Sequence, residues 1–142
     1  WALDPQNENL FEIYNYIKNL AIDIFANTDV ELVFREVDFK QNKFDLPLEF
    51  SRNISMIFRE ILHNILKHAE ATKIEISCSV SDDYFSIGIT DDGKGFDTGN
   101  DYQGRGLKNM RSRAEKINGV VNIVSIPGKG TKIKLRFVVD KV

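Results

Sequence analysis

The sequence predicts an α+β fold, a two-layer α/β sandwich in which a mixed sheet of about five strands carries three helices on one face. In three segments the apolar residues recur at helical spacing, and in most others they alternate with polar residues as in half-buried strands. One-sided alternation implies that helices cover a single face of the sheet. With 142 residues, 42% of them hydrophobic, the chain is expected to be one domain over residues 1–142 with one core.

Three helices are expected, at residues 5–26, 47–69 and 107–118. Asp4 is a typical N-cap residue and Pro5 suits the first helical position, so the first helix is expected to begin there. Pro47 is expected to open the second helix. Gly119 follows the third helix, where we expect it to act as the C-terminal cap.

Five strands are expected, at residues 30–38, 73–81, 84–90, 120–126 and 131–139, with a loop at 40–46. In the second of these, Ile74, Ile76 and Cys78 alternate with polar residues, so they should share the buried face. Cys78 is therefore interpreted as a small apolar core residue without reactivity. As the only cysteine in the sequence, it excludes an intrachain disulfide and a cysteine-built zinc site.

The charge composition argues against several classes of partner. Its 19 Lys and Arg against 21 Asp and Glu leave a net charge of -2, so we expect no nucleic-acid partner and no direct membrane contact. No apolar run approaches the ~18 residues that span a bilayer, and residues 1–5 do not resemble a signal peptide. Together with the single cysteine, this composition favours a cytoplasmic location.

A first group of polar residues lies on the second expected helix. Glu60, Asn64, Lys67 and His68 are spaced i, i+4, i+7 and i+8, which places them on one helical face where all four could touch one ligand. A carboxylate, an amide and a lysine suit a hydrated Mg²⁺ ion and the phosphates that it bridges. The spacing alone equally fits the solvated side of an amphipathic helix.

A second group follows the strand 84–90, in a glycine-rich stretch expected to be a mobile surface loop. The Asp91 carboxylate could accept a hydrogen bond from an exocyclic amine, and Gly93 and Gly95 could let the backbone approach a flat ring. Phe96 follows them as a large apolar residue. An ordinary Asp-Gly turn is the alternative interpretation.

A third group, Gly104, Arg105, Gly106 and Leu107, opens the third expected helix. Unpaired backbone N–H groups at a helix N-terminus favour an anion, so phosphate binding is the functional interpretation and a flexible joint is the alternative. The sequence contains neither a P-loop nor a Gly-x-Gly-x-x-Gly motif. A nucleotide would therefore have to bind in another way.

Taken in order, residues 60–69, 91–96, 104–114 and 128–131 resemble the N box, G1 box, G2 box and terminal Gly-Thr of the Bergerat-fold ATPases. The resemblance covers nearly the whole chain. The Lys-His-Ala ending of the first box and the Gly-Leu-x-x-Met-Arg-x-Arg-Ala run of the third are similar to the catalytic domain of bacterial sensor histidine kinases. The specific resemblance is to the subfamily that signals to LuxR-type response regulators.

This resemblance implies that ATP lies between the second and third helices. Asp91 would take the adenine amine, and Gly93 and Gly95 would allow the ring to approach. Thr131 would help to hold the base through water, and His68 would line the adenine and ribose side.

The resemblance also implies an Mg²⁺ ion coordinated by Asn64, with Lys67 at a phosphate and Glu60 as base or polariser near the γ-phosphate. The reaction would be phosphoryl transfer to a histidine nitrogen.

Residues 96–105 would form the ATP lid, with Phe96 and Arg105 at its two ends. The amides of Gly104, Gly106 and Leu107 would touch the phosphates.

The partners implied are a dimerisation domain that carries the acceptor histidine, a response regulator, and a second copy in a full-length homodimer. No such hairpin is present in this sequence, and residues 1–26 are interpreted in part as the connection to it. The fragment alone is expected to bind ATP without autophosphorylating, as the cytoplasmic part of a receptor that can be membrane-bound. A free-standing anti-sigma-type serine kinase of the same fold and a non-catalytic docking module are the alternatives.

Overall fold

The computed structural model describes residues 7–37, 45–80, 84–96 and 104–138. The elements follow one another as β1 (Asn7–Asn9), α1 (Leu10–Ile24), β2 (Glu31–Val37), β3 (Asp45–Pro47), α2 (Leu48–Asn64), the π-helical turn η1 (Ile65–Ala69), β4 (Lys73–Val80), β5 (Tyr84–Asp91), α3 (Gly104–Glu115), β6 (Gly119–Ile126) and β7 (Gly130–Val138). In this part of the chain no helix has both the length and the hydrophobicity that crossing a membrane requires.

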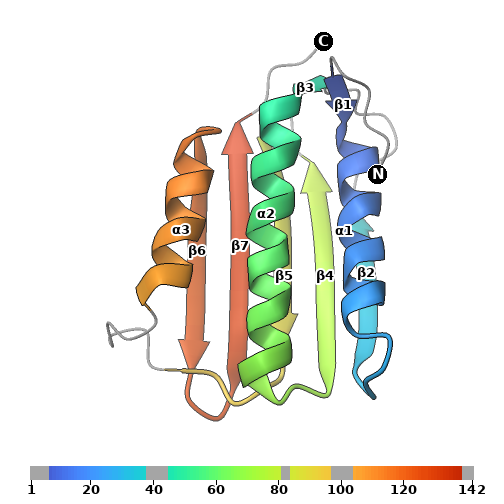
Figure 1. Cartoon of the computed structure of the whole chain (residues 1–142), viewed down its shortest axis with the longest axis vertical. Coiled ribbons are helices and arrows are strands. Elements are labelled where there is room, and N and C mark those ends of the chain that lie inside the picture. The colour runs from blue at the N-terminus through green and yellow to red at the C-terminus, as the bar shows by residue number, and fades with distance from the viewer. Residues whose placement is uncertain (1–6, 38–44, 81–83, 97–103, 139–142) are drawn as a thin grey trace.

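A five-stranded sheet in the order β2-β4-β5-β7-β6 forms one layer of the molecule. Strands β2 and β4 are parallel, and the other neighbouring pairs are antiparallel, so the sheet is mixed. Helices α1, α2 and α3 all lie on the same face of this sheet (Figure 1). The predicted two-layer α+β sandwich is therefore confirmed.

The N-terminal boundaries differ from those expected. Residues Asn7–Asn9 do not belong to a helix but form β1, which pairs antiparallel with β3 at Asp45–Pro47. The first helix therefore begins at Leu10, the expected loop at 40–46 ends in a strand, and α2 begins one residue after Pro47. Asn is a poor helix former, and the Asn-Glu-Asn segment instead satisfies its backbone by pairing with a segment far along the chain.

The ends of the other two helices also differ from a regular α-helix. The last five residues of the predicted second helix form the π-helical turn η1, and Glu70 ends it in the left-handed conformation with φ 54°. After α3 the left-handed residue is Asn118, with φ 56°, so Gly119 is not the cap that was predicted. A Cβ at Gly119 would lie 3.2 Å from the Ala114 carbonyl oxygen. Limited space for a side chain, and not a left-handed backbone conformation, therefore favours glycine at this position.

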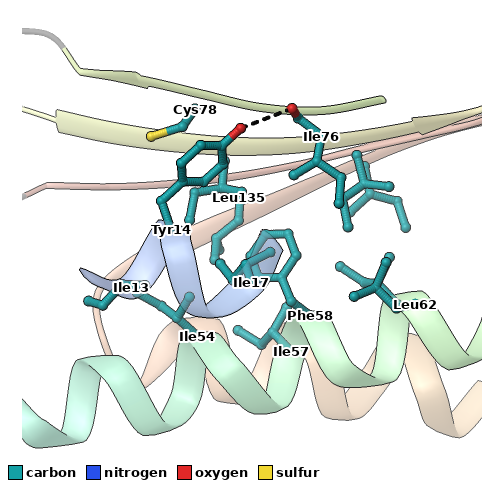
Figure 2. Close-up of a cluster of buried hydrophobic side chains, with 14 of the residues drawn as sticks. Ile13, Tyr14, Ile17, Ile54, Ile57, Phe58, Leu62, Ile76, Cys78 and Leu135 are labelled. Atoms are coloured by element: carbon teal, nitrogen blue, oxygen red, sulfur yellow. Dashed lines mark hydrogen bonds between the residues drawn. The ribbon is translucent and has the colours of Figure 1, made fainter. Parts of the chain in front are cut away.

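The core lies between the helices and the sheet (Figure 2). Tyr14 of α1 is fully buried there, and its hydroxyl lies 3.0 Å from both the Arg35 and the Ile76 carbonyl oxygens. These bonds join α1 to β2 and β4. Cys78 is buried as predicted, and burial raises the pKa of its thiol, which keeps it protonated and unreactive. The predicted inward face of β4 is likewise confirmed.

Candidate functional site

A pocket of about 470 Å³ lies between α2, η1, the end of β5 and α3. It is partly open to solvent and has a mixed apolar and polar wall. Its lining comprises Glu60, Ile61, Asn64, Ile65, His68, Ala69, Asp91, Lys94, Gly95, Phe96, Leu107, Met110, Thr131 and Ile133. Residues from all four predicted motifs therefore contribute to one cavity, although the outermost of them, Glu60 and Thr131, are 71 positions apart in the sequence.

Asp91 ends β5 and is only 4% exposed, yet it carries a carboxylate at the pocket wall. Burial raises its pKa above the ordinary value, because the ionised form is removed from water, and the amides of Gly93 and Thr131 act in the opposite direction. The Gly93 amide donates to Asp91 Oδ1 at 2.8 Å. These amides do not fully offset the cost of burying the charge, since the net shift of the pKa is upward, and this marks Asp91 as a candidate binding residue.

Close packing within the chain requires glycine at both positions that follow Asp91, Gly93 and Gly95. A Cβ at Gly93 would lie 2.2 Å from the Ala69 carbonyl oxygen, and a Cβ at Gly95, where φ is +64°, would lie 2.2 Å from the Ile126 carbonyl oxygen. The Lys94 amide donates to the same Ala69 oxygen at 2.7 Å. These contacts fix the segment between η1 and the end of β6. Gly95 lines the pocket and Gly93 does not, and the predicted role of both glycines beside a flat ring stays a prediction.

Asp92 was not predicted to have a role, but it anchors this segment from the other side. Its Oδ1 accepts hydrogen bonds from the amides of Thr72 and Lys73 at 2.8 and 2.9 Å, and its Oδ2 accepts one from the Thr72 hydroxyl. These bonds lower the pKa of Asp92, the Thr72 side chain having the largest effect. The turn after η1 is thus tied to the end of β5.

Regular helical spacing predicted that four polar residues of α2 and η1 lie together on one face, and the structure brings three of them to the pocket. Glu60, Asn64 and His68 line the pocket, whereas Lys67 is exposed and, among the described residues, does not line it. The π-helical turn explains this difference, because its i→i+5 bonding displaces the residues after Ile65 from α-helical positions. His63 lies in a separate hollow between α1 and α2.

The third predicted motif opens α3 and reaches the pocket at Leu107. Gly104, Arg105 and Gly106 form the first turn of α3, three residues before the expected start, and Leu107 lines the pocket. A helix N-terminus carries unpaired N–H groups and a partial positive charge. Most of the predicted lid, residues 97–103, lies outside the described residues.

Thr131 is the last predicted residue, and the register places it directly opposite Asp91. It lines the pocket, and its hydroxyl lies 2.7 Å from the hydroxyl of Ser125 on β6. Sequence reasoning did not single out Ser125. The signal that could have found it was a polar residue at an inward position of a strand whose other inward residues, Val121 and Ile123, are apolar.

The structure defines an α+β domain with a partly polar pocket, and comparison with known families shows which class of α+β domain it is. Residues 50–141 match the family described as histidine kinase-, DNA gyrase B-, and HSP90-like ATPase. The match extends over more than half of the chain. The chain belongs to this family.

Two curated relatives have similar sequences. Over 126 residues the chain is 35% identical to the sensor protein VraS of Staphylococcus aureus (strain COL) and 33% identical to VraS of Staphylococcus epidermidis (strain ATCC 12228 / FDA PCI 1200). In both cases 88% of this chain is aligned, and the aligned part is 35% of the relative. The chain therefore spans about a third of the length of these sensor proteins.

Solved structures share the fold. The histidine kinase AdeS of Acinetobacter baumannii superposes with a TM-score of 0.73 at 15% identity, covering 99% of this chain and 70% of that one. The histidine kinase domain of the Erythrobacter litoralis EL346 blue-light activated kinase gives 0.71 at 18% identity, covering 96% and 65%. At these identities the likeness concerns the fold.

Proposed function

We propose that the chain is the ATP-binding catalytic domain of a sensor histidine kinase, of the subfamily that signals to LuxR-type response regulators. The observation that carries the proposal is the buried Asp91 carboxylate in the wall of a 470 Å³ pocket that Leu107 of α3 also lines. A carboxylate suits the exocyclic amine of adenine, and a helix N-terminus suits phosphates. Membership of an ATPase family and similarity to VraS support the same assignment.

The base would lie at the Asp91 end of the pocket. Asp91 would accept from the adenine amine, and Thr131 on the neighbouring strand would contact the same edge of the base. Apolar groups of Ile65, Met110 and Ile133 line the cavity and suit the faces of a purine ring. His68 would lie on the ribose side.

The phosphates would lie toward α3, with the amides of Gly104, Gly106 and Leu107 as donors and Arg105 beside them. Lys67 would have to extend toward the phosphates from its exposed position on η1. The segment from Phe96 to Arg105 is proposed to close over the nucleotide as its lid.

The pocket wall fits an Mg²⁺ ion bound together with phosphates. Asn64 offers an amide oxygen on the pocket wall as a ligand, and no cluster of three or more His, Cys, Asp or Glu exists among the described residues. This donor set suits Mg²⁺, which binds through few protein ligands and keeps several waters. When bound, the ion supplies charge neutralisation at the bridging phosphate oxygens.

In the proposed reaction a histidine nitrogen of a separate dimerisation domain attacks the γ-phosphorus. A phosphorus–nitrogen bond forms, the bond to the β-phosphate oxygen breaks, and ADP leaves. Glu60, exposed at the pocket rim, would accept the proton that the imidazole nitrogen releases. The remaining residues position the reactants, which is the main contribution of a protein to phosphoryl transfer.

The proposed partners are the dimerisation domain, a second copy of the whole protein and a response regulator, with this domain on the cytoplasmic side of a membrane. Residues 1–142 would form one catalytic domain.

The proposed function is tested by adding the chain and Mg-ATP to a histidine-bearing hairpin of a related kinase. Phosphohistidine on the hairpin is expected, with none on the chain alone. Phosphate transfer to a serine of an added partner protein of an anti-sigma-type kinase would instead contradict the histidine-kinase proposal and favour the serine-kinase alternative.

Nucleotide binding is tested separately by titration calorimetry with Mg-ADP. The wild type is expected to bind, and Asp91→Asn to weaken binding by about 1–3 kcal/mol, the usual cost of losing a hydrogen bond to a charged group. Glu115→Gln, an exposed change on α3, is the matched control. Absence of binding by the wild type would contradict the proposal and favour a non-catalytic docking module.

A further inference from the structure

We propose that Ser125 is a positioning residue that makes the Thr131 hydroxyl a hydrogen-bond acceptor, so that the pocket selects a 6-aminopurine over a 6-oxopurine. This inference rests on the proposed function, because it concerns the base end of the same pocket. It adds a residue and a mechanism of base selection that the motifs do not contain.

Ser125 lies behind the pocket wall and is 8% exposed. Its Oγ is 2.9 Å from the Phe96 amide nitrogen, 3.2 Å from the Gly130 carbonyl oxygen and 2.7 Å from Thr131 Oγ1. Phe96 and Thr131 both line the pocket. One buried hydroxyl thus joins two wall segments that lie on opposite sides of it in the sequence.

Counting protons assigns a direction to these three bonds. The Phe96 amide can only donate, so it uses one lone pair of Ser125, and the Gly130 carbonyl can only accept, so it takes the single Ser125 proton. The bond between the two hydroxyls can then form only if Thr131 donates to the remaining lone pair of Ser125. This is the one arrangement that satisfies all three contacts, and buried polar groups strongly favour full satisfaction.

The consequence is that Thr131 has no proton left for a ligand. Its Oγ1 can only accept, and the neighbouring carboxylate of Asp91, when ionised, can also only accept. If Thr131 contacts the base directly, and not through the water that the resemblance implies, two acceptors on adjacent strands fit an exocyclic amine, which has two donors. A carbonyl at the same ring position would meet two acceptors and be rejected, because an unpaired buried acceptor is costly.

The backbone around Gly130 keeps these two strands close. Gly130 has φ +87°, and a Cβ there would lie 2.1 Å from the Asp91 carbonyl oxygen. Thr131 is therefore held directly beside Asp91, and only its hydroxyl rotation is left to be fixed. Ser125 supplies that constraint.

The test compares the affinities of Mg-ADP and Mg-IDP, which carry an amine and a carbonyl at the same ring position, by calorimetry. Ser125→Ala is expected to reduce the preference for ADP by roughly tenfold, the equivalent of one net hydrogen bond. Without Ser125 the Thr131 hydroxyl can rotate and donate to a carbonyl. Ser125→Thr keeps a hydroxyl and is expected to preserve the preference, and Ser79→Ala, a half-buried serine on β4, is the matched control.

Thr131→Val gives a second readout that does not depend on the stability of the Ser125 variants. It is expected to reduce the ADP preference by itself, and adding Ser125→Ala to it should reduce the preference no further. An unchanged ADP to IDP ratio in Ser125→Ala or in Thr131→Val would overturn the inference, as would an equal loss of affinity for both nucleotides. Failure of the wild type to bind either nucleotide would instead overturn the proposed function.

Discussion

Asp91 and Asp92 are neighbours in the sequence whose carboxyl groups have opposite environments. Asp91 is buried, and burial raises its pKa, whereas Asp92 accepts hydrogen bonds at the surface that lower its pKa. A raised carboxyl pKa in the folded state means that Asp91 favours folding at pH values below its ordinary pKa. This contribution to stability is lost as the pH rises through the pKa of Asp91 in the folded state. The lowered pKa of Asp92 has the opposite effect: Asp92 favours folding above its ordinary pKa, and this contribution is lost as the pH falls through its pKa in the folded state.

Replacement of Asp91 should therefore stabilise the chain while it weakens nucleotide binding. We expect Asp91→Asn to raise the free energy of unfolding at neutral pH, because the amide removes a buried charge. Urea unfolding at pH 7 and at pH 3 measures the difference in the free energy of unfolding between the variant and the wild type, which should be smaller at pH 3. A loss of stability at pH 7 would contradict a desolvated carboxylate at this position.

Replacement of Asp92 should have the opposite effect on stability. We expect Asp92→Ala to lower the free energy of unfolding at neutral pH by about 1–2 kcal/mol, in the lower range for hydrogen bonds to a charged group because this carboxylate is exposed. The difference from the wild type should disappear as the pH falls below about 4, through the lowered pKa of Asp92. Unfolding curves from pH 2 to 7 measure it, and a difference independent of pH would be the contrary result.

At the scale of elements, the π-helical turn η1 matters most because it carries part of the pocket wall. Ala69 is the last residue of η1. Its carbonyl oxygen accepts a hydrogen bond from the Lys94 amide, and the residue lies against Gly93. The segment after β5 can approach η1 this closely only because Gly93 has no Cβ. The glycine motif therefore positions the pocket floor, whatever its relation to a ligand.

Gly93→Ala should separate β5 from η1. We expect a loss of about 1–3 kcal/mol in the free energy of unfolding, as for other overpacked sites, together with weaker binding of Mg-ADP. Gly128→Ala is the matched control, because Gly128 has φ +83° and a Cβ added there would have no other atom within 4 Å. That variant should lose about 1–2 kcal/mol from backbone strain alone and keep its affinity. Equal affinities in both glycine variants would argue against a role of this contact in shaping the pocket.

The elements that sequence reasoning located best are those with a strong local pattern. Alternation along β4 predicted the burial of Ile74, Ile76 and Cys78, and it is confirmed. The pairing of β1 with β3 was not predicted, because it joins residues about 40 positions apart whose sequence has no strand pattern. Lys67 does not line the pocket, because helical spacing assumes regular bonding, which the turn η1 lacks, and its predicted contact with a phosphate stays a prediction.

Residues that act through hydrogen bonds to distant segments were missed for a related reason. Ser125 contacts Phe96, and Asp92 contacts Thr72, and neither pairing follows from residue type or periodicity. The residues that line the pocket were predicted better, because Asp91, Asn64 and Thr131 belong to motifs whose order along the chain was informative.

At the scale of the whole molecule, one layer of helices covers one face of a mixed sheet (Figure 1). The pocket is lined by residues of α2, α3 and the end of β5. The core that supports this arrangement is centred on α1, α2 and the middle strands (Figure 2). Tyr14 contributes there both by its ring and by the bonds of its hydroxyl to β2 and β4. Tyr14 and its partners thus support the fold without lining the pocket.

Tyr14→Phe should therefore reduce stability and leave the site intact. We expect a loss of about 1–3 kcal/mol in the free energy of unfolding, because the buried Ile76 carbonyl and the part-buried Arg35 carbonyl lose the one hydroxyl proton that they share, while the ring is kept. The affinity for Mg-ADP should stay that of the wild type. Guanidinium unfolding and calorimetry measure the two quantities, and weaker nucleotide binding by the folded variant would contradict the separation of Tyr14 from the pocket.

A crystal structure of the chain with ADP and Mg²⁺ would examine the nucleotide site most directly. We expect the adenine ring in the pocket between α2 and α3, with its exocyclic amine within hydrogen-bond distance of the Asp91 carboxylate and its phosphates directed toward the first turn of α3. A nucleotide bound elsewhere, or an adenine amine directed away from Asp91, would contradict the proposed site.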